Sequence, residues 1–170
     1  MSSAPTITVA GEEEPISIGF DAVAAYHGQA ALAMLAITFQ GLRATLPILS
    51  PDRPAQRTAL SVISGHPGPG VRDAFEFVTR VVTRDAYVID RSLPLARFNP
   101  TADISYSFVI SLGDRKVRAA LNPGVLPPQF FEFLAMKDKT ADDLADFSRL
   151  RSAIAKHALA QDPASLFSLD

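Results

Sequence analysis

Two histidines are the residues in this chain best suited to chemistry. His27 lies within a mostly apolar stretch, and His66 lies in the glycine- and proline-rich segment of residues 65–70. A neutral imidazole can bind a metal through one nitrogen while a neighbour orients the other, and its titration range suits proton transfer. The alternatives are a core histidine bonded to a carbonyl at position 27 and a rigid connector at residues 65–70.

Three polar side chains near these histidines are candidate partners. Tyr26 offers a hydroxyl and Gln29 an amide beside His27, and Asp73 offers a carboxylate seven residues after His66. Residues 65–70 form neither a dinucleotide fingerprint nor a phosphate loop, but a helix start after them can receive an anion. We therefore predict a cofactor-binding site made by Tyr26, His27, Gln29, His66 and Asp73, with His27 and His66 as the metal ligands. Packing or solvation can account for each of these polar residues equally well.

The chain contains no cysteine, which removes several kinds of chemistry. Disulfides, thiolate nucleophiles and thiolate-bound zinc or iron–sulfur clusters are excluded. A transition metal such as zinc would need imidazole, carboxylate or backbone oxygen as ligands. Nucleophilic serine catalysis has no support either, because no GxSxG elbow is present.

The elements that must position these residues follow from hydropathy patterns. A helix over residues 21–45 is apolar on nearly every face, which predicts that it is buried and that His27, Ala31, Met34 and Thr38 share one side. Three prolines predict a loop over residues 47–54. A strand over residues 59–64 leads into the loop of His66 and then a short helix. Two short strands are expected around an acidic turn in residues 5–19, and another at residues 86–90.

The second half of the chain shows the clearest strand pattern. Apolar and polar residues alternate from Ile104 to Leu112, and Gly113-Asp114 favours a type II′ turn into a second strand ending at Leu121. A short helix containing Phe130 and Phe131 should dock on this sheet. Thr140 can cap a last amphipathic helix, over about residues 140–159. The predicted fold class is α+β, with an antiparallel or mixed sheet packed against a long buried helix and shorter helices.

Size and charge limit the classes of function. A chain of 170 residues with 48% hydrophobic residues predicts one globular domain over residues 1–170. A net charge of -2 disfavours nucleic acid as a partner. The stretch of residues 30–39 is about half the length of a spanning helix, and the N-terminus lacks a secretory pattern, so we expect no membrane association and a cytoplasmic location.

The string Tyr26-His27-Gly28-Gln29-Ala30-Ala31 resembles the HGHxC-type motif of the FmdE-like family, which takes its name from a component of formylmethanofuran dehydrogenase. A looser match covers residues 70–75, where the family has an Asp-Ala step in a helix. The resemblance spans about residues 18–135. It implies an α+β core, a homodimer and a role in one-carbon or redox metabolism.

The departures from that family's motif affect the chemistry. Gln29 stands at the family's second histidine and Ala31 at its cysteine, so half of the expected metal site is missing. Either His27 and His66 rebuild a metal site with help from Asp73, or Ala31 opens an apolar pocket where His27 and Gln29 orient a small organic ligand. We therefore expect a small-molecule or metal-cofactor binding protein. The alternatives are a noncatalytic assembly protein that uses Phe130 and Phe131, and an enzyme that uses His66 as acid or base at an anion-binding loop.

Overall fold

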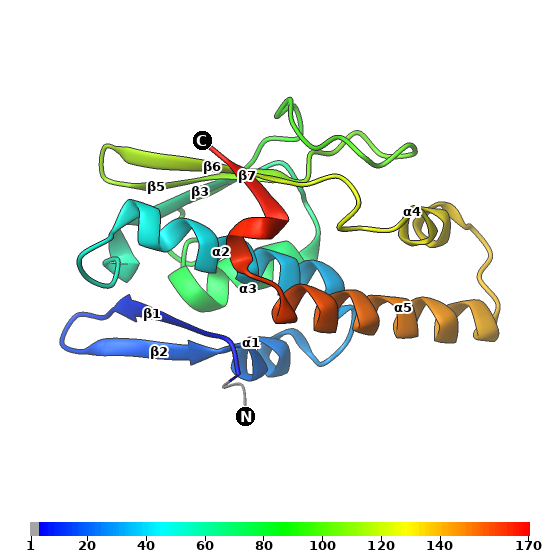
Figure 1. Ribbon diagram of the computed structural model, residues 1–170, viewed down its shortest axis with the longest axis horizontal. Coiled ribbons are helices and arrows are strands. Elements are labelled where there is room, and N and C mark those ends of the chain that lie inside the picture. Colours follow the sequence, from blue (N-terminus) through cyan, green and yellow to red (C-terminus); the bar gives the residue numbers. More distant parts are fainter. Residues whose placement is uncertain (1–3) are drawn as a thin grey trace.

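The protein has the expected α+β fold, seen in a computed structural model that describes residues 4–170. The chain forms a five-stranded sheet and a separate two-stranded hairpin. Figure 1 shows the larger sheet on one side of the molecule, helices α2 and α3 beneath it, and α1, α5 and the hairpin beyond them. The strands are β1 (Thr6–Ala10), β2 (Pro15–Gly19), β3 (Leu60–Ser64), β4 (Tyr87–Ile89), β5 (Ser107–Leu112), β6 (Arg115–Leu121) and β7 (Phe167–Leu169). The helices are α1 (Phe20–His27), α2 (Leu32–Leu49), α3 (Pro69–Thr79), α4 (Pro128–Ala135) and α5 (Ala141–Ala160), with short 3-10 turns at Arg57–Ala59 and Pro163–Leu166.

The five-stranded sheet is mixed, with the order β4-β3-β5-β6-β7. Only β3 and β4 run parallel, and the chain between them forms α3, as a parallel crossover requires. The predicted hairpin is confirmed: β5 pairs antiparallel with β6 around Gly113, whose φ of +59° suits the type II′ turn. The strand is shorter than predicted, because residues 104–106 precede its first ladder pair at Ser107. The two N-terminal pieces pair as a separate antiparallel hairpin, β1-β2.

Helix α2 is the centre of the core. It is the one helix in the described chain long and apolar enough to cross a membrane, and 72% of that window is buried inside the molecule. Gly41 lets it approach the sheet, since a Cβ there would clash with the Phe108 ring. The predicted loop at residues 47–54 begins later than expected, because α2 continues through Pro47 to Leu49. A proline in the last turn removes only one intrahelical hydrogen bond, and the helix ends two residues later.

The predicted continuous helix over residues 21–45 is wrong, because the chain breaks between α1 and α2. Gly28 caps α1 in the left-handed conformation with φ of +103°, and Gln29 and Ala31 also have positive φ, of +58° and +51°. A glycine at this position is the common way to end a helix. His27 and Ala31 therefore belong to different elements, and His27 does not share a helical face with Met34 and Thr38.

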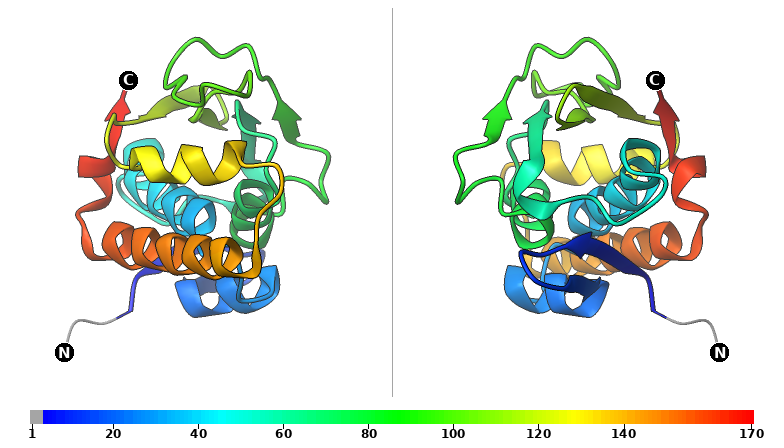
Figure 2. Two further views of the ribbon diagram at one scale, coloured as in Figure 1. Left: turned by 90° about the vertical axis from the view of Figure 1, so that its right-hand side faces the viewer. Right: turned by 90° about the vertical axis from the view of Figure 1, so that its left-hand side faces the viewer.

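Helix α4 and the beginning of α5 project from the body in Figure 1, whereas the end of α5 packs on α2; Figure 2 shows α4 lying beside α5. Thr140 caps α5 as predicted, in a reciprocal capping box with Asp143. Helix α4 packs against α5, where the Phe133 and Phe147 rings stack at 5.1 Å. The prediction that α4 docks on the sheet is thus largely wrong. Phe131 alone makes an aromatic contact with Tyr106, which directly precedes β5.

Candidate functional site

His27 and Asp73 form the most specific polar contact among the predicted site residues. His27 ends α1 and Asp73 lies in the second turn of α3, and His27 Nδ1 lies 2.7 Å from Asp73 Oδ2. Their side chains are 10% and 16% exposed. A carboxylate only accepts hydrogen bonds, so Nδ1 carries a proton, and in the neutral ring Nε2 keeps its lone pair. Asp73 Oδ1 lies 3.4 Å from Arg72 Nη2, so each carboxylate oxygen has a partner.

Nε2 of His27 faces the start of α3. A Cβ built on Gly70 would lie 3.8 Å from Nε2, 3.4 Å from the backbone nitrogen of Leu35 and 3.8 Å from Met34 Cβ. Gly70 therefore leaves room where the imidazole meets the first turns of α2 and α3. A histidine with an Nδ1 carboxylate partner and an accessible Nε2 is oriented to accept a proton, a hydrogen bond or a metal ion.

His66 adopts the opposite tautomer. Its Nδ1 accepts a hydrogen bond from the backbone N–H of Gly68 at 2.9 Å, so its Nε2 carries the proton in the neutral ring. Burial, helped by the charge of Arg91, lowers the pKa of His66 from 6.5 to about 4. The ring is therefore neutral at physiological pH and presents an N–H donor. A Cβ at position 68 would lie 2.8 Å from Nδ1, so a larger residue there would displace the imidazole.

The loop that carries His66 is fixed by its own hydrogen bonds. Ser64 Oγ donates to the backbone oxygen of His66 at 3.0 Å, and the backbone N–H of His66 donates back to Ser64 Oγ at 3.2 Å. The imidazole packs edge-on against Tyr106 with ring centroids 4.9 Å apart. Both rings line a small cavity of about 10 Å³, which is close to the smallest space that holds one water.

Both histidines lie near the start of α3. His66 contacts Gly68, and His27 reaches Gly70 and Asp73. Met34 lies beside Gly70 and also lines the His66 cavity. The two histidines are far apart along the chain, and the tertiary structure places both at one helix start.

Two predicted partners lie elsewhere. Tyr26 is 53% exposed and leans on Phe77 at 5.2 Å, beside Arg57 and Arg80. It therefore lies near the end of α3, where Phe77 is, and not at the start of that helix. Gln29 is exposed in the linker between α1 and α2.

Ala31 does not open the apolar pocket that we expected beside His27. Ala31 is exposed, and the small cavity lined by His66 and Tyr106 does not include His27, Gln29 or Ala31. The alanine is small, but the break after Gly28 turns it outward. The pocket prediction depended on a continuous helix that the chain does not form.

The donor set does not complete a metal site. Among residues 4–170 no group of three or more histidine and carboxylate side chains could hold a metal ion. His27 offers Nε2, but Asp73 is engaged by His27 and Arg72, and His66 presents a proton at Nε2. Zinc bound by His27 and His66 stays a prediction, and this arrangement does not favour it.

Tyr106 is a site residue that the sequence did not single out. The alternating pattern indicated its burial, which is confirmed at 3% exposure. No local signal indicated its contact with His66, because that contact depends on how the loop after β3 meets the residues before β5. Phe130, a candidate interface residue, is 4% exposed and packs on Phe131 and Phe147 within the molecule.

Comparison with protein-family models finds no matching family, and comparison with curated protein sequences finds no matching relative. The fold and the site geometry therefore carry the functional inference.

Proposed function

We propose that this protein binds a small molecule at the start of α3, with the His27–Asp73 pair as the recognition group. The observation that carries the proposal is the 2.7 Å hydrogen bond between side chains 46 residues apart. The imidazole of His27 is mostly buried, and its Nε2 lies near the starts of α2 and α3 without a hydrogen-bond partner among the described residues. This arrangement supports a role in ligand recognition. Structural burial alone would be served as well by an apolar residue.

The two histidines supply complementary polar groups. His27 Nε2 accepts a hydrogen bond, whereas His66 Nε2 donates one and stays neutral because the pKa of His66 is about 4. A ligand with both a donor and an acceptor suits such a pair better than a cation does. His66 is correspondingly a poor general base near pH 7, so we place binding ahead of His66-based catalysis.

The resemblance to the FmdE core supports a finer proposal. A cytoplasmic accessory protein in one-carbon or redox metabolism, acting as a homodimer, is consistent with that resemblance and with the α+β fold. Zinc is the metal alternative at His27, and it predicts a different binding profile from an organic ligand.

A set of His27 variants tests the proposal. His27→Asn keeps an N–H donor for Asp73 but removes Nε2, and His157→Asn changes an exposed histidine of α5. Thermal shift with NADH, FMN, folate and zinc, together with native mass spectrometry of the purified full chain, should reveal a ligand. That ligand should bind the wild type and His157→Asn, and bind His27→Asn at least about tenfold more weakly.

Three outcomes would be decisive. A bound organic molecule whose retention depends on His27 supports the proposal, and zinc with the same dependence replaces the organic ligand by the metal alternative. Binding that is unchanged in His27→Asn, or no binding of any probe or co-purified molecule, contradicts it.

A further inference from the structure

Three arginines lie together near the end of α3, at the opposite end of that helix from Asp73. Two surface hollows share Arg57 and Arg80: the first, of about 310 Å³, also contains Arg84, and the second, of about 320 Å³, also contains Tyr26. Burial lowers the pKa of Arg57, and the positive charges of Arg80 and Arg84 lower it further. An anion bound beside these like charges would relieve their repulsion.

Two of the three guanidinium groups are held in place by the backbone. Arg57 donates through Nε to the Val78 oxygen at 2.9 Å and through Nη2 to the Phe77 oxygen at 2.6 Å. Arg84 donates to four backbone oxygens, those of Arg57, Thr58, Leu60 and Thr79. Because these bonds already fix the side chains of Arg57 and Arg84, a ligand would lose little affinity to their ordering.

Several N–H groups of the arginine cluster have no partner. Arg57 Nη1 has no hydrogen-bond partner among the described residues, and Arg80 contacts only Glu76, where Nε and Oε1 are 3.6 Å apart. The Arg80 side chain is 52% exposed, so its two Nη atoms are accessible. Planar guanidinium groups with unused N–H donors match the oxygens of a phosphate.

Two carboxylates lie beside the arginines, and only one of them is occupied. Glu76 accepts hydrogen bonds from the backbone N–H groups of Val82 and Thr83, at 2.8 and 3.0 Å, and from the Thr83 hydroxyl. Its charge partly offsets those of the arginines. Glu12 lines the first hollow from the turn between β1 and β2, and it takes part in no ion pair among the described residues. Glu12 is therefore the group that would oppose a bound anion.

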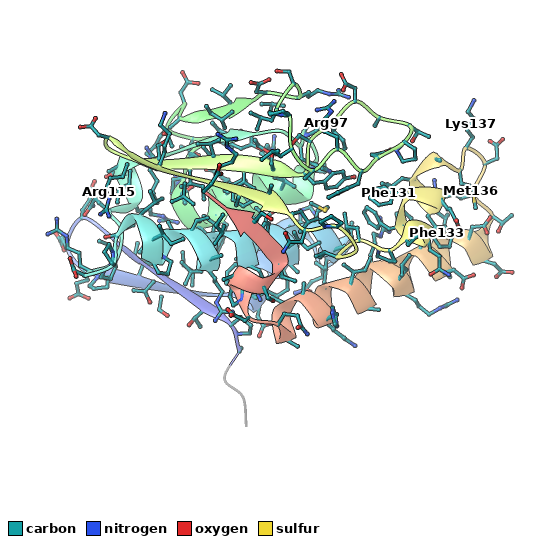
Figure 3. All side chains as sticks on the ribbon, turned by 45° about the horizontal axis from the view of Figure 1, so that its top comes forward. Arg97, Arg115, Phe131, Phe133, Met136 and Lys137 are labelled. Carbon is teal, nitrogen blue, oxygen red and sulfur yellow. The ribbon has the colours of Figure 1, made fainter. Side chains whose placement is uncertain are left out.

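Arg97, which Figure 3 labels, illustrates an arginine whose charge is balanced within the fold. It lies in the loop before β5, pairs with Asp103 and donates through Nη1 to the Arg91 oxygen at 2.9 Å. Arg80 has no carboxylate of this kind, because Glu76 is held by the backbone of the turn after α3. The charge of Arg80 is thus left for another partner.

An exposed aromatic ring lies next to the arginines in the second hollow. Tyr26 is 53% exposed, and its ring centroid lies 5.2 Å from that of Phe77. Both rings line the second hollow together with Arg57 and Arg80. Covering such a ring with a flat ligand group is favourable. The hollow therefore combines a ring surface with cationic donors.

We propose that this arginine cluster binds a phosphate monoester whose flat ring packs on Tyr26. Arg57 Nη1 and the Nη atoms of Arg80 would donate to the phosphate oxygens, and Arg84 would add positive charge from behind its backbone bonds. A phosphate group suits these donors because it carries a charge of about -1.5 to -2 at pH 7 and three acceptor oxygens. The site uses neither His27 nor a metal.

Phenyl phosphate and inorganic phosphate are the probes, titrated into the full chain and followed by backbone amide chemical shifts. Phenyl phosphate should saturate one site per chain, with the largest shifts at the residues that line the second hollow. It should bind about threefold to tenfold more tightly than inorganic phosphate, because its ring covers Tyr26. Benzyl alcohol, which has the ring without the charge, should not bind measurably, and added salt should weaken phosphate binding.

Charge variants test the assignment in both directions. Arg80→Gln should weaken phenyl phosphate binding at least about tenfold, because it removes a charge and its donors. Arg53→Gln, at an exposed position in the loop after α2, removes the same charge elsewhere and should leave the affinity within about twofold. Glu12→Gln should instead strengthen binding by about twofold to threefold.

Tyr26→Ala separates the ring from the charge. This variant should bind inorganic phosphate as the wild type does and lose the preference for phenyl phosphate. Thermal midpoints check that each variant folds. Arg80→Lys, which keeps the charge but not the planar fork, is the second variant at position 80 and should bind between the wild type and Arg80→Gln.

Four results would overturn the proposal. These are no saturable binding of phenyl phosphate, equal binding of benzyl alcohol, shifts confined to residues outside the two hollows, and equal weakening by Arg80→Gln and Arg53→Gln. His27→Asn should bind phenyl phosphate as the wild type does. A phosphate-bearing probe such as FMN that binds here should respond to Arg80→Gln and not to His27→Asn, so failure of this proposal is distinct from failure of the function proposed for His27.

Discussion

His27 and His66 show how one residue type acquires two chemical roles from its hydrogen bonds. Asp73 fixes the proton of His27 at Nδ1, and the Gly68 N–H fixes the proton of His66 at Nε2. Neither tautomer can be inferred from the residues adjacent in sequence. The partner of His27 is 46 residues away, and the partner of His66 depends on the backbone turn at residues 66–68.

We predict that His66 makes stability depend on pH. Its pKa is about 4 in the folded chain and about 6.5 in the unfolded chain. Well above pH 6.5 the ring is neutral in both states, so its titration does not change the free energy of unfolding. As the pH falls toward 4, the unfolded chain takes up a proton that the folded chain does not, so the free energy of unfolding decreases, by about 2 kcal/mol at pH 5.

Urea unfolding at about pH 7.5 and pH 5 measures this effect. His66→Asn provides an Oδ1 acceptor for the Gly68 N–H but does not titrate, so its pH dependence should be shallower by about that amount. His157→Asn, at an exposed position, is the control for loss of a histidine. Identical pH slopes for the wild type and His66→Asn would contradict the prediction.

At the scale of elements, the break between α1 and α2 determines where His27 points. Gly28, Gln29 and Ala31 all have left-handed backbone angles within four residues. Glycine accepts this conformation, whereas alanine in it costs about 1 to 2 kcal/mol. The linker thus keeps a conformation that local preference opposes, which indicates that packing of α1 and α2 imposes it.

Ala31→Gly should therefore stabilise the protein by about 0.5 to 1 kcal/mol. The relief of the left-handed alanine exceeds the extra entropy that glycine loses on folding, and glycine is also the better N-cap of α2. Ala30 has no positive φ, so Ala30→Gly should instead be neutral or destabilising. Chemical denaturation of both variants provides the comparison, and a more stable Ala30→Gly than Ala31→Gly would show that the linker is unstrained.

At the scale of the whole molecule, α2 joins the parts that make the site. Its first turn faces His27 and Gly70, its middle packs on the sheet, and Gln40 donates hydrogen bonds to the oxygens of Ala158 and Gln161 at the end of α5. Its apolar composition makes it resemble a membrane helix in isolation, but the sheet, α3 and α5 cover it. The separation between α2 and the sheet is set at Gly41.

Gly41→Ala should destabilise the fold by about 1 to 3 kcal/mol, despite the higher helix propensity of alanine. The added methyl group would overlap the Phe108 ring and approach Phe167, so the sheet would have to shift. Gly19→Ala is the comparison, because no atom lies within 4 Å of its Cβ and its φ of -82° suits alanine, so it loses only the glycine N-cap of α1. The urea midpoint should fall further for Gly41→Ala than for Gly19→Ala, and equal midpoints would mean that the core absorbs the methyl group.

Local patterns predicted the elements whose signals are local. The alternation that ends at Leu112, the turn residue Gly113 and the cap at Thr140 each act within a few residues, so the β5-β6 hairpin and α5 were predictable. The helix break at residues 28–31 was not predictable, because the apolar residues before and after the linker keep the helical period. Burial was predicted for Tyr106, but its neighbours were not.

The amino-acid sequence alone determined the fold class, the exclusion of thiol chemistry and the two histidines worth examining, because composition and short-range periodicity carry that information. Only the tertiary structure decided that His27 pairs with Asp73, that Tyr26 and Ala31 face away from them, and that Tyr106 packs between His66 and Phe131. A side-chain contact between distant residues depends on how helices and strands pack. That packing is a property of the whole core and leaves no local mark on the residues that meet.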